Sequence, residues 1–532
     1  MSYPNSNNPY GFGPFLEWRE NCDFYAEDPF VQKAVQVFTG DRAAAVDAAA
    51  RAISRKVSFR WRKMAETIAW PDKRPWVMHY DGHGNRIDRI VRPHETEVME
   101  QEVFGEALFS AKTDPWERFI KMYLIYQNGE ACISCPVTCT EGLVAVLARF
   151  ADTPEIQAIL THCKEGRDGR FGIGAQYLSE IQGGSDVRAN LLEARLENGQ
   201  WRLYGTKFFC SATHADYAMV TAKPKGSEKV GLFVMPSWLP GDKAREKRNG
   251  FTIDRIKWKM GTSELPTAEM TFNGALAYPV GPLDRGLANM VAIVLTYSRL
   301  TVGLSGAASM MRAWREAARY CDFREAFGLS IGRMPMVVGQ LKTIEKAAKR
   351  TLAGAFRLHG EILALPGGLA RETDARESED LKRRRFRVRE LIMLQKMATS
   401  FDAPDVLRLA MSLFGGHGVM EDFSSLPRLY RDAAVNELWE GPRNVLLAQV
   451  HRDLLGAAAW YAPERFAADI LAGGPEDLVT ALCREIVEIL SGTDLFEMSP
   501  AAVEACARWD RFCHRLYHAY QDVAMAMVAA QA

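Results

Sequence analysis

The residues best suited to chemistry in this sequence surround Glu440, a carboxylate that stands between a large aromatic residue and a glycine. Trp439 can supply an apolar wall, and burial against such a wall raises a carboxyl pKa toward neutrality, where a general base works best. Gly441 lets another molecule approach the backbone closely. A lone Glu before a helix more often complements the helix dipole, so the surrounding sequence has to decide between the two interpretations.

Three upstream motifs carry further groups that could bind a ligand. Residues 176–187 include Gly-Gly-Ser-Asp, whose free N–H groups and hydroxyl can cradle a phosphate or the polar edge of a ligand. Residues 205–211 combine two aromatic side chains with a serine, and residues 324–328 combine an arginine with Phe-Gly. Each motif also has an ordinary structural explanation: a surface turn, a core strand and a helix end, respectively.

A fourth motif leads into Glu440 itself: Phe-Gly-Gly-His-Gly at 414–418, followed by Arg431 and Asp432. In this order and at these distances the motifs resemble the signature of the acyl-CoA dehydrogenase flavoprotein family, over roughly residues 130–456. Further strings, such as Cys-Pro-Val-Thr at 135–138, are similar to the AidB-like branch of that family. The chain departs from the usual Glu-Gly-Thr at Pro442. Arg443 is an added charge, whose simplest interpretation is a side chain that points to water.

The resemblance implies roles for particular residues. Glu440 would remove the substrate α-proton, and Arg324 would pair with the FAD pyrophosphate of a neighbouring subunit, which requires a homodimer or a homotetramer built as a dimer of dimers. The FAD-binding residues it implies are Tyr177, Leu178, Ser179, Gly184, Ser185, Phe209, Cys210, Ser211, Arg324, Phe327, Gly415, Gly416 and Asn444. The substrate-binding residues it implies are Ser185, Arg299 and Gly441.

The reaction implied by the resemblance is the FAD-dependent α,β-dehydrogenation of an acyl-CoA thioester to a 2-enoyl-CoA. Donors would hold the thioester carbonyl while Glu440 takes the α-proton, and the β-hydride would pass to flavin N5. An electron-transfer partner such as electron-transfer flavoprotein would reoxidise the cofactor. The sequence does not specify the acyl group, although the large terminal regions are compatible with bulky, cyclic or long-chain acyl groups.

Hydrophobic periodicity places these residues in an α+β fold. Residues 1–170 carry mostly helical patterns, whereas residues 171–284 alternate with period two, including two runs that meet at Asn198-Gly199, a strong hairpin signal. Residues 285–456 contain four helical patterns that favour a four-helix bundle, and residues 457–532 form an additional helical tail beyond it. The resemblance implies that these parts pack as one subunit around a middle β-barrel or sandwich.

Composition excludes several classes of protein. Among 532 residues, 66 Lys and Arg balance 66 Asp and Glu, so no net field attracts nucleic acid or an anionic membrane. The tail from residue 456 carries five Arg, no Lys and eleven acidic residues, the wrong sign for a DNA-binding appendage. The basic run at 382–389 is typical of a solvated helix start rather than a phosphate site.

Ten scattered cysteines are typical of buried, reduced thiols in a cytoplasmic protein. Cys132, Cys135 and Cys139 lack the second Cys or His pair of a zinc site, so we expect no metal. No secretory signal is visible, and the most apolar stretch, 286–311, is interrupted by Arg299, which disfavours a membrane span.

Three alternatives to the dehydrogenase remain open at this point. One is an AidB-like flavoprotein of the DNA alkylation response that binds DNA. Another is a flavin oxidase with no CoA substrate, in which an Asp base is expected instead of Glu440. The last is a helical-bundle protein whose site has lost its activity.

Overall fold

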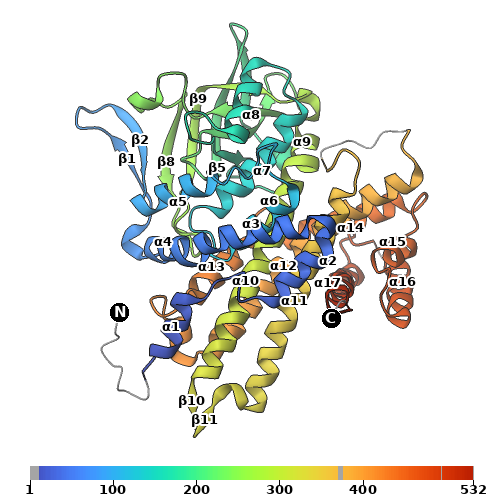
Figure 1. The fold of residues 1–532 in the computed structure, drawn as a ribbon. Helices are drawn as coiled ribbons and strands as arrows, with labels where there is room; N and C mark the ends of the chain where they lie inside the picture. The colour runs from blue at the N-terminus through green and yellow to red at the C-terminus, as the bar shows by residue number, and fades with distance from the viewer. Residues whose placement is uncertain (1–10, 370–375, 493, 531–532) are drawn as a thin grey trace.

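The computed structural model describes residues 11–369, 376–492 and 494–530. It forms the three expected parts, with helices at the N-terminus, a β-barrel in the middle and a long helical bundle (Figure 1). The polar stretch at residues 1–10, and residues 370–375 of the loop that precedes the basic run, lie outside the described residues.

The N-terminal part consists of eight helices and one hairpin among the described residues. Gly40, with φ +57°, separates two helices where the periodicity suggests one continuous pattern over 32–59. Helix α7 (Ser134–Arg149) begins six residues before the expected start, because Pro136 lies in its first turn, where a missing N–H needs no acceptor. The other elements are α1 (Gly13–Asn21), α2 (Pro29–Thr39), α3 (Ala43–Arg55), α4 (Arg62–Ile68), β1 (Trp76–Tyr80), β2 (Arg86–Val91), α5 (His94–Phe104), α6 (Pro115–Tyr126) and α8 (Pro154–Glu165).

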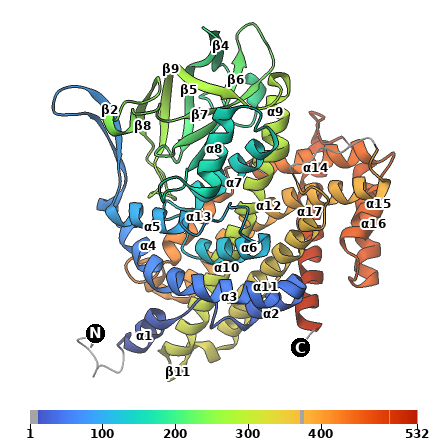
Figure 2. The same ribbon diagram turned by 45° about the horizontal axis from the view of Figure 1, so that its top comes forward.

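The middle part is a seven-stranded sheet in the order β3-β6-β4-β5-β9-β7, with β8 paired to β9. A further pairing of β6 with β7 closes the sheet into a barrel, whose upper end is tilted toward the viewer in Figure 2. The predicted hairpin turn is present, since Asn198 and Gly199 have the positive φ angles that this turn requires. The strands are β3 (Gly174–Tyr177), β4 (Glu193–Glu197), β5 (Gln200–Ser211), β6 (Tyr217–Pro224), β7 (Gly231–Pro236), β8 (Phe251–Ile256) and β9 (Thr267–Pro279).

The C-terminal part is built around α10 (Leu295–Phe323), which packs against α11 (Pro335–Leu363) and α12 (Glu379–Leu413). Within the described residues, one helical stretch, Leu283–Phe323, has the length and hydropathy of a membrane span, and 61% of its most apolar window is buried inside the protein. α10 and α12 approach closely because Gly303 and Gly306 face the side chains of Gln395 and Thr399, where a Cβ would clash.

The tail does not lie beyond the bundle, as the sequence suggested, but packs along it. Helix α17 (Pro500–Ala530) contacts both α11 and α12, while α14 (Arg443–Ala457) packs mainly on α12 (Figure 2). Helices α15 (Pro463–Ile470) and α16 (Glu476–Leu490) connect the two. The fourth position beside the three long helices is therefore taken by the tail.

The basic run at 382–389 forms the first turns of α12 and is not simply solvated. Arg385 is buried and donates to Glu377 and to the main-chain oxygens of Pro366 and Gly368. Arg387 pairs with Asp469 of α15 at 3.0 Å. Arg385 therefore fixes the loop before α12, and Arg387 joins α12 to the tail.

Candidate active site

The predicted base lies in a tight loop between α13 (Leu426–Asn436) and α14. Glu440 and Gly441 have φ angles of +58° and +99°, so two consecutive left-handed residues reverse the chain before Pro442 caps the next helix. For a residue with a Cβ this conformation costs roughly 1–2 kcal/mol. Surrounding contacts must therefore hold Glu440 in place.

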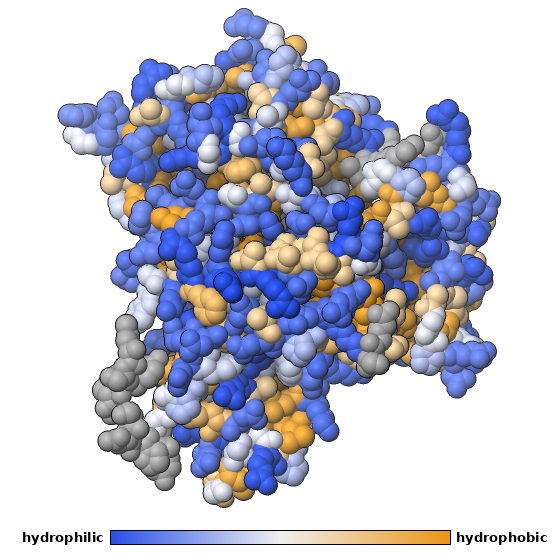
Figure 3. Space-filling view, in the orientation of Figure 1, coloured by the Kyte–Doolittle hydropathy of each residue, from blue (hydrophilic) through white to orange (hydrophobic). Residues whose placement is uncertain are grey.

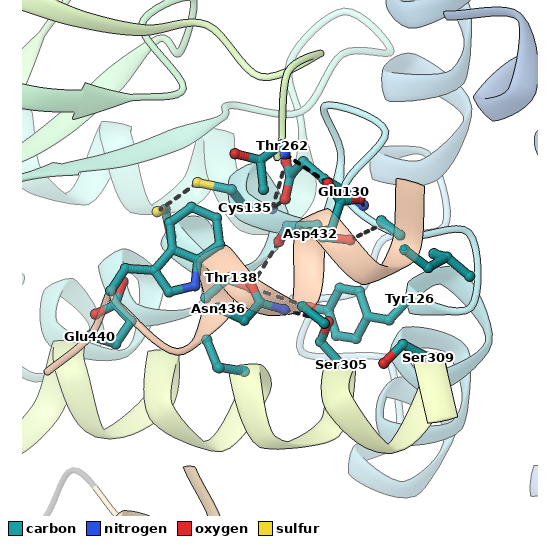
Figure 4. Close-up of a pocket in the computed structure, with 17 residues that line it drawn as sticks. Tyr126, Glu130, Cys135, Thr138, Thr262, Ser305, Ser309, Asp432, Asn436 and Glu440 are labelled. Carbon is teal, nitrogen blue, oxygen red and sulfur yellow. Dashed lines mark hydrogen bonds between the residues drawn. The ribbon is translucent and has the colours of Figure 1, made fainter. Parts of the chain in front are cut away.

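Glu440 and Trp439 form one side of an open cavity with about 570 Å³ of empty space (Figure 4). The remaining walls come from α6, α7, α10, α13 and one loop of the barrel. Hydroxyl and amide groups face this space as well as apolar ones. The polar lining residues are Tyr126, Ser134, Thr138, Thr262, Ser305, Ser309 and Asn436.

Two buried cations lie behind the base. Arg299 of α10 donates from Nε to the main-chain oxygen of Glu440 at 3.0 Å, and Lys396 of α12 donates to the oxygens of Glu437 and Gly441, each at 2.8 Å. Burial raises the pKa of Glu440 to about 7, while the charges of Arg299 and Lys396 act to lower it. A carboxyl group with this pKa can exchange a proton near neutral pH.

The same cations have lowered pKa values. Burial lowers the pKa of Lys396 to about 7 and that of Arg299 to about 10, although Glu440 opposes the shift in both. Arg299 does not line the cavity. Its predicted role in substrate binding would therefore have to act through the loop that it holds.

Asp432 ties three parts of the chain together above the cavity. Its carboxylate accepts the main-chain N–H of Thr262 at 2.7 Å and that of Glu130 at 3.1 Å (Figure 4). The barrel loop comes close enough only because residue 261 is glycine, since a Cβ there would lie 2.2 Å from the Arg431 oxygen. The Arg-Asp pair in the sequence motif therefore holds the cavity wall.

The loop at 179–186 is held by a buried ion pair. Glu180 accepts from Lys207 Nζ at 2.8 Å and from the main-chain N–H groups of Leu191 and Leu192. Burial lowers the pKa of Lys207 to about 8. The predicted ligand-binding residues Gly184 and Ser185 are thereby presented on an exposed, anchored turn.

The barrel face beside this loop fits a flat ring system with polar edges. The ring of Phe209 is 52% exposed although it belongs to a strand, and the hydroxyls of Ser179 and Ser211 are only half-buried. The main-chain N–H of Phe208 donates to the Ser179 oxygen at 2.9 Å, which joins the two motifs. This surface suits the isoalloxazine of FAD that the resemblance implies.

A chain of contacts links this face to the cavity. Ser211 Oγ lies 3.0 Å from Thr267 Oγ1, and Lys259 Nζ donates to both Thr267 at 2.8 Å and Thr262 at 2.9 Å. Thr262 lines the cavity that contains Glu440. Hydrogen bonds thus join the predicted flavin face to one wall of the cavity that contains Glu440.

Other predicted cofactor residues of this region contribute differently. The side chains of Tyr177 and Cys210 are buried in the core, so only their main-chain atoms can reach a ligand. Leu178 is half-buried, and its oxygen accepts from Lys207. Asn444 is exposed in the first turn of α14.

A second group of predicted residues lies at the far end of the bundle, at the bottom of Figure 1. Arg324 begins the hairpin β10 (Glu325–Ala326) and β11 (Leu329–Ser330), whose turn contains Phe327. The Arg324 guanidinium lies 5.8 Å from the ring of Phe12, and that ring lies 4.7 Å from His417, next to Gly415 and Gly416. These residues lie close together at one end of the bundle. That they form a site shared with a neighbouring subunit stays a prediction.

Arg443 does not point to water, so the simplest interpretation of that residue is wrong. Its side chain is 11% exposed and pairs with Asp510 of α17, with Nε 2.9 Å from Oδ1. Arg443 also donates to the Met397 oxygen at 3.2 Å. The residue two positions after the base loop therefore anchors the tail.

Beside this pair, Asp402 of α12 lies 2.8 Å from His514 Nε2 and 2.7 Å from His518 Nε2. Among the described residues, this is the one group whose spacing could suit a metal ion. However, Arg443 faces His514 Nδ1 at 3.3 Å, which requires that nitrogen to accept and leaves Nε2–H to donate to Asp402. The group therefore docks the tail through hydrogen bonds.

Several site residues gave no signal that the sequence analysis could use. Lys396, Lys259, Glu130 and the cavity residues of α6 and α10 stand in ordinary helical or loop patterns, far from the motifs. Asp432, Cys135 and Thr138 belong to motifs in the sequence, but the motifs give them no role in a site. Tertiary packing alone brings these side chains to Glu440.

Comparison with known families agrees with the geometry. Residues 17–163 match the adaptive response protein AidB N-terminal domain, residues 175–275 the acyl-CoA dehydrogenase middle domain and residues 368–455 the acyl-CoA dehydrogenase C-terminal domain. Acyl-CoA dehydrogenase family member 11 of Caenorhabditis elegans is 25% identical over 95% of this chain and 78% of its own. AidB of Escherichia coli K12 is 28% identical over 73% and 70%.

Solved structures share the fold over almost the whole chain. The apo-form of Bd2924 superposes with a TM-score of 0.83 at 23% identity, covering 96% of this chain and 98% of its own. Caenorhabditis elegans ACDH-11 in complex with C11-CoA gives 0.77 at 21% identity, over 96% and 91%. Acyl-CoA dehydrogenase complexed with FAD from Bacillus anthracis gives 0.71 at 17% identity, over 96% and 86%. The chain is therefore a member of the acyl-CoA dehydrogenase family, an FAD-dependent oxidoreductase of its AidB-like branch.

Proposed function

We propose that the enzyme removes two hydrogens from Cα and Cβ of an acyl-CoA thioester, with Glu440 as the base that takes the α-proton. The observation that carries this proposal is the position of Glu440, at the side of an open cavity and with a pKa raised to about 7. A base of this strength is partly ionised at neutral pH and still binds the proton that it removes.

The residues that would hold FAD are those of the exposed barrel face, Ser179, Phe209 and Ser211, together with the turn at Gly184 and Ser185. In the arrangement that we propose, Arg324 of a neighbouring chain would pair with the pyrophosphate. When bound, FAD supplies the acceptor for the two electrons that leave with the hydrogen of Cβ.

The chain's own groups then act on the thioester. Among the described residues, the main-chain N–H of Glu440 makes no hydrogen bond, so it is a free donor for the thioester oxygen. Arg299 and Lys396 hold the loop in the left-handed turn that presents this N–H and the carboxylate together. Trp439 shields the carboxylate, and its ring N–H is buried without an acceptor.

We propose that the acyl group is larger than a short straight chain. One structural neighbour was solved with C11-CoA, which agrees with a long acyl chain in this fold. We propose that reoxidation uses an electron-transfer partner such as electron-transfer flavoprotein. Turnover confined to short straight-chain acyl-CoAs would contradict the proposed substrate size.

An anaerobic titration of the flavin-loaded protein with a panel of acyl-CoAs tests the function. We expect one or more of them to bleach the oxidised flavin, with the reduction rate of Glu440→Gln lowered about 10³-fold, since a positioned base contributes roughly 10²–10⁴-fold. Glu228→Gln is the matched control, because this exposed carboxylate of the barrel does not line the cavity.

Two outcomes would overturn the proposal. If no acyl-CoA reduces the flavin of a protein that binds FAD, the dehydrogenase proposal is wrong. Reduction by substrates without CoA and salt-dependent binding to duplex DNA would then be measured next. If Glu440→Gln reduces as fast as the wild type, another group is the base.

A further inference from the structure

We infer that Lys396 is a positioning residue for the base: it fixes the backbone on both sides of Glu440 and keeps a positive charge beside the carboxylate. This inference rests on the proposed function, because it assigns a role relative to Glu440 as the base. Lys396 is absent from the cavity lining. Its effect on the substrate must therefore pass through the loop.

The geometry of the loop is the first argument. Lys396 Nζ lies 2.8 Å from both the Glu437 oxygen and the Gly441 oxygen, which are the two ends of the turn that contains the base. Arg299 binds the carbonyl oxygen of Glu440, between these two ends, at 3.0 Å. We call Lys396 and Arg299 the base clamp, since their side chains come from two different helices and meet at the loop.

Burial is the second argument. Lys396 is fully buried, and an unpaired ammonium in such a place costs several kcal/mol unless a nearby charge or a hydrogen bond compensates it. Two carbonyl oxygens could be satisfied by a neutral donor. The presence of an ionisable lysine on α12 at this place is explained if its ammonium form acts on Glu440, whose proximity opposes the lowering of the Lys396 pKa.

All charges that face the clamp must be counted before a pH effect is predicted. Lys396 is influenced by Glu440, Arg299 and Glu437, and Arg299 by four groups of its own: Glu440, Arg389, Glu390 and Asp453. Glu130 and Asp432 line the same cavity. Glu440 itself is shifted upward by burial and downward by Arg299 and Lys396 only, so removal of the lysine charge must raise its pKa further.

The decisive experiment compares Lys396→Met with Lys396→Gln in the flavin-loaded protein. Met removes the charge and the donors, whereas Gln removes the charge but keeps an amide N–H₂. In both variants the acid limb of the pH profile for flavin reduction should move up by about one unit, so that reduction at pH 7 slows up to tenfold. Lys346→Met on α11 is the control, because this lysine is exposed and pairs only with Asp522.

Amide hydrogen exchange separates the effect of the Lys396 hydrogen bonds on the loop from the effect of its charge on Glu440. In the resting protein the amides of residues 437–441 should exchange faster in Lys396→Met, and remain closer to wild type in Lys396→Gln. Superimposed pH profiles for the wild type and both variants would overturn the inference, as would unchanged exchange in Lys396→Met. If Lys396→Met does not fold, Lys396→Gln alone still carries the test of the charge.

A measurement without turnover keeps this inference distinct from the proposed function. Infrared difference spectra of the wild type against Glu440→Gln, from about pH 5 to pH 9, report directly on protonation of the Glu440 carboxyl around its pKa. If no acyl-CoA reduces the flavin, the proposed function fails, yet Lys396→Gln must still shift this titration upward. An unshifted titration rejects the role of Lys396 whatever the substrate turns out to be.

Discussion

Glu440 and Phe327 both hold a left-handed backbone, with φ angles of +58° and +54°, but the chain surrounds them in different ways. Around Glu440, buried cations from α10 and α12 bind the carbonyl oxygens of Glu437, Glu440 and Gly441. Phe327 stands at a hairpin tip with its ring 95% exposed, and Figure 3 shows apolar side chains at the surface of this lower end.

The difference distinguishes a region whose conformation is fixed by contacts within one chain from a region that lacks such contacts. A strained residue that is held by buried donors has its conformation determined within the chain, ready for a reacting group. A strained, exposed aromatic residue gains nothing from its own chain beyond an ordinary hairpin turn. The Phe327 end is therefore where a neighbouring chain would have to contribute if the cofactor site is shared.

Among the variants that test this contrast, Arg324→Ala has the largest expected effect. If the far end binds the FAD pyrophosphate of a neighbouring chain, loss of a charge-assisted hydrogen bond should weaken FAD binding about 10- to 100-fold, and the loss should be a property of the oligomer. Flavin fluorescence titration and sedimentation of the same samples measure both. Arg319→Ala is the control, since Arg319 is an exposed arginine on the same helix.

Unchanged FAD affinity in Arg324→Ala would contradict this interpretation, because the Phe327 end of the bundle would then have no part in the cofactor site. Weaker binding without any dependence on association would show instead that the site closes within one chain.

At the other end, the pKa of Glu440 predicts the pH dependence of flavin reduction. The base must be ionised to accept the α-proton, so a pKa of about 7 means that the rate falls as pH drops below 7, tenfold per unit well below it. Stopped-flow reduction across pH measures the limb. If the midpoint of this acid limb lay near the ordinary pKa of a Glu carboxyl, bound ligands would be shown to lower the pKa of Glu440 again.

The tail should weaken at acid pH through Asp402. Although burial alone would raise its pKa, hydrogen bonds from His514 and His518 lower it, so the folded state favours the ionised carboxylate. This stability is present above the unfolded pKa of about 4 and is lost as pH falls below it. Asp402→Asn should cost about 1 kcal/mol at neutral pH and flatten that loss.

Chemical unfolding of Asp402→Asn and wild type at two pH values measures this effect. Equal stabilities at both pH values would mean that the tail docks mainly through apolar contacts of α17.

The smallest expected effect is at the hairpin tip. Phe327→Gly relieves the left-handed strain in a turn that accepts glycine, and should stabilise the isolated chain by up to about 1 kcal/mol in thermal unfolding. If a second copy covers Phe327, the same change weakens association while it stabilises the separated chain. A loss of stability at concentrations where the wild type is monomeric would contradict the strain argument.

The sequence predicts the parts of this protein that local signals determine. The hairpin at Asn198-Gly199 and helix α6 follow from turn chemistry and periodicity, and the position of Glu440 follows from its motif.

What the sequence could not predict depends on packing between distant segments. Lys396 and Arg299 are 97 residues apart in the chain. No local pattern distinguishes Lys396 from other polar residues on an apolar helix, and the resemblance that implicates Arg299 in substrate binding does not reveal its contact with the base loop. The tail was expected outside the bundle because its acidic composition says nothing about which helix face it covers. The role of Arg443 was likewise settled by Asp510, 67 residues away.

That pair has a consequence for how this branch has diverged. Since Arg443 is held by a residue of the tail, the two positions form a unit that natural selection should keep or lose together. Related sequences that end before the tail should carry a small or uncharged residue at the position of Arg443, because an arginine there would be left without its acidic partner beside the base loop. Covariation of these two positions across an alignment would test this coupling.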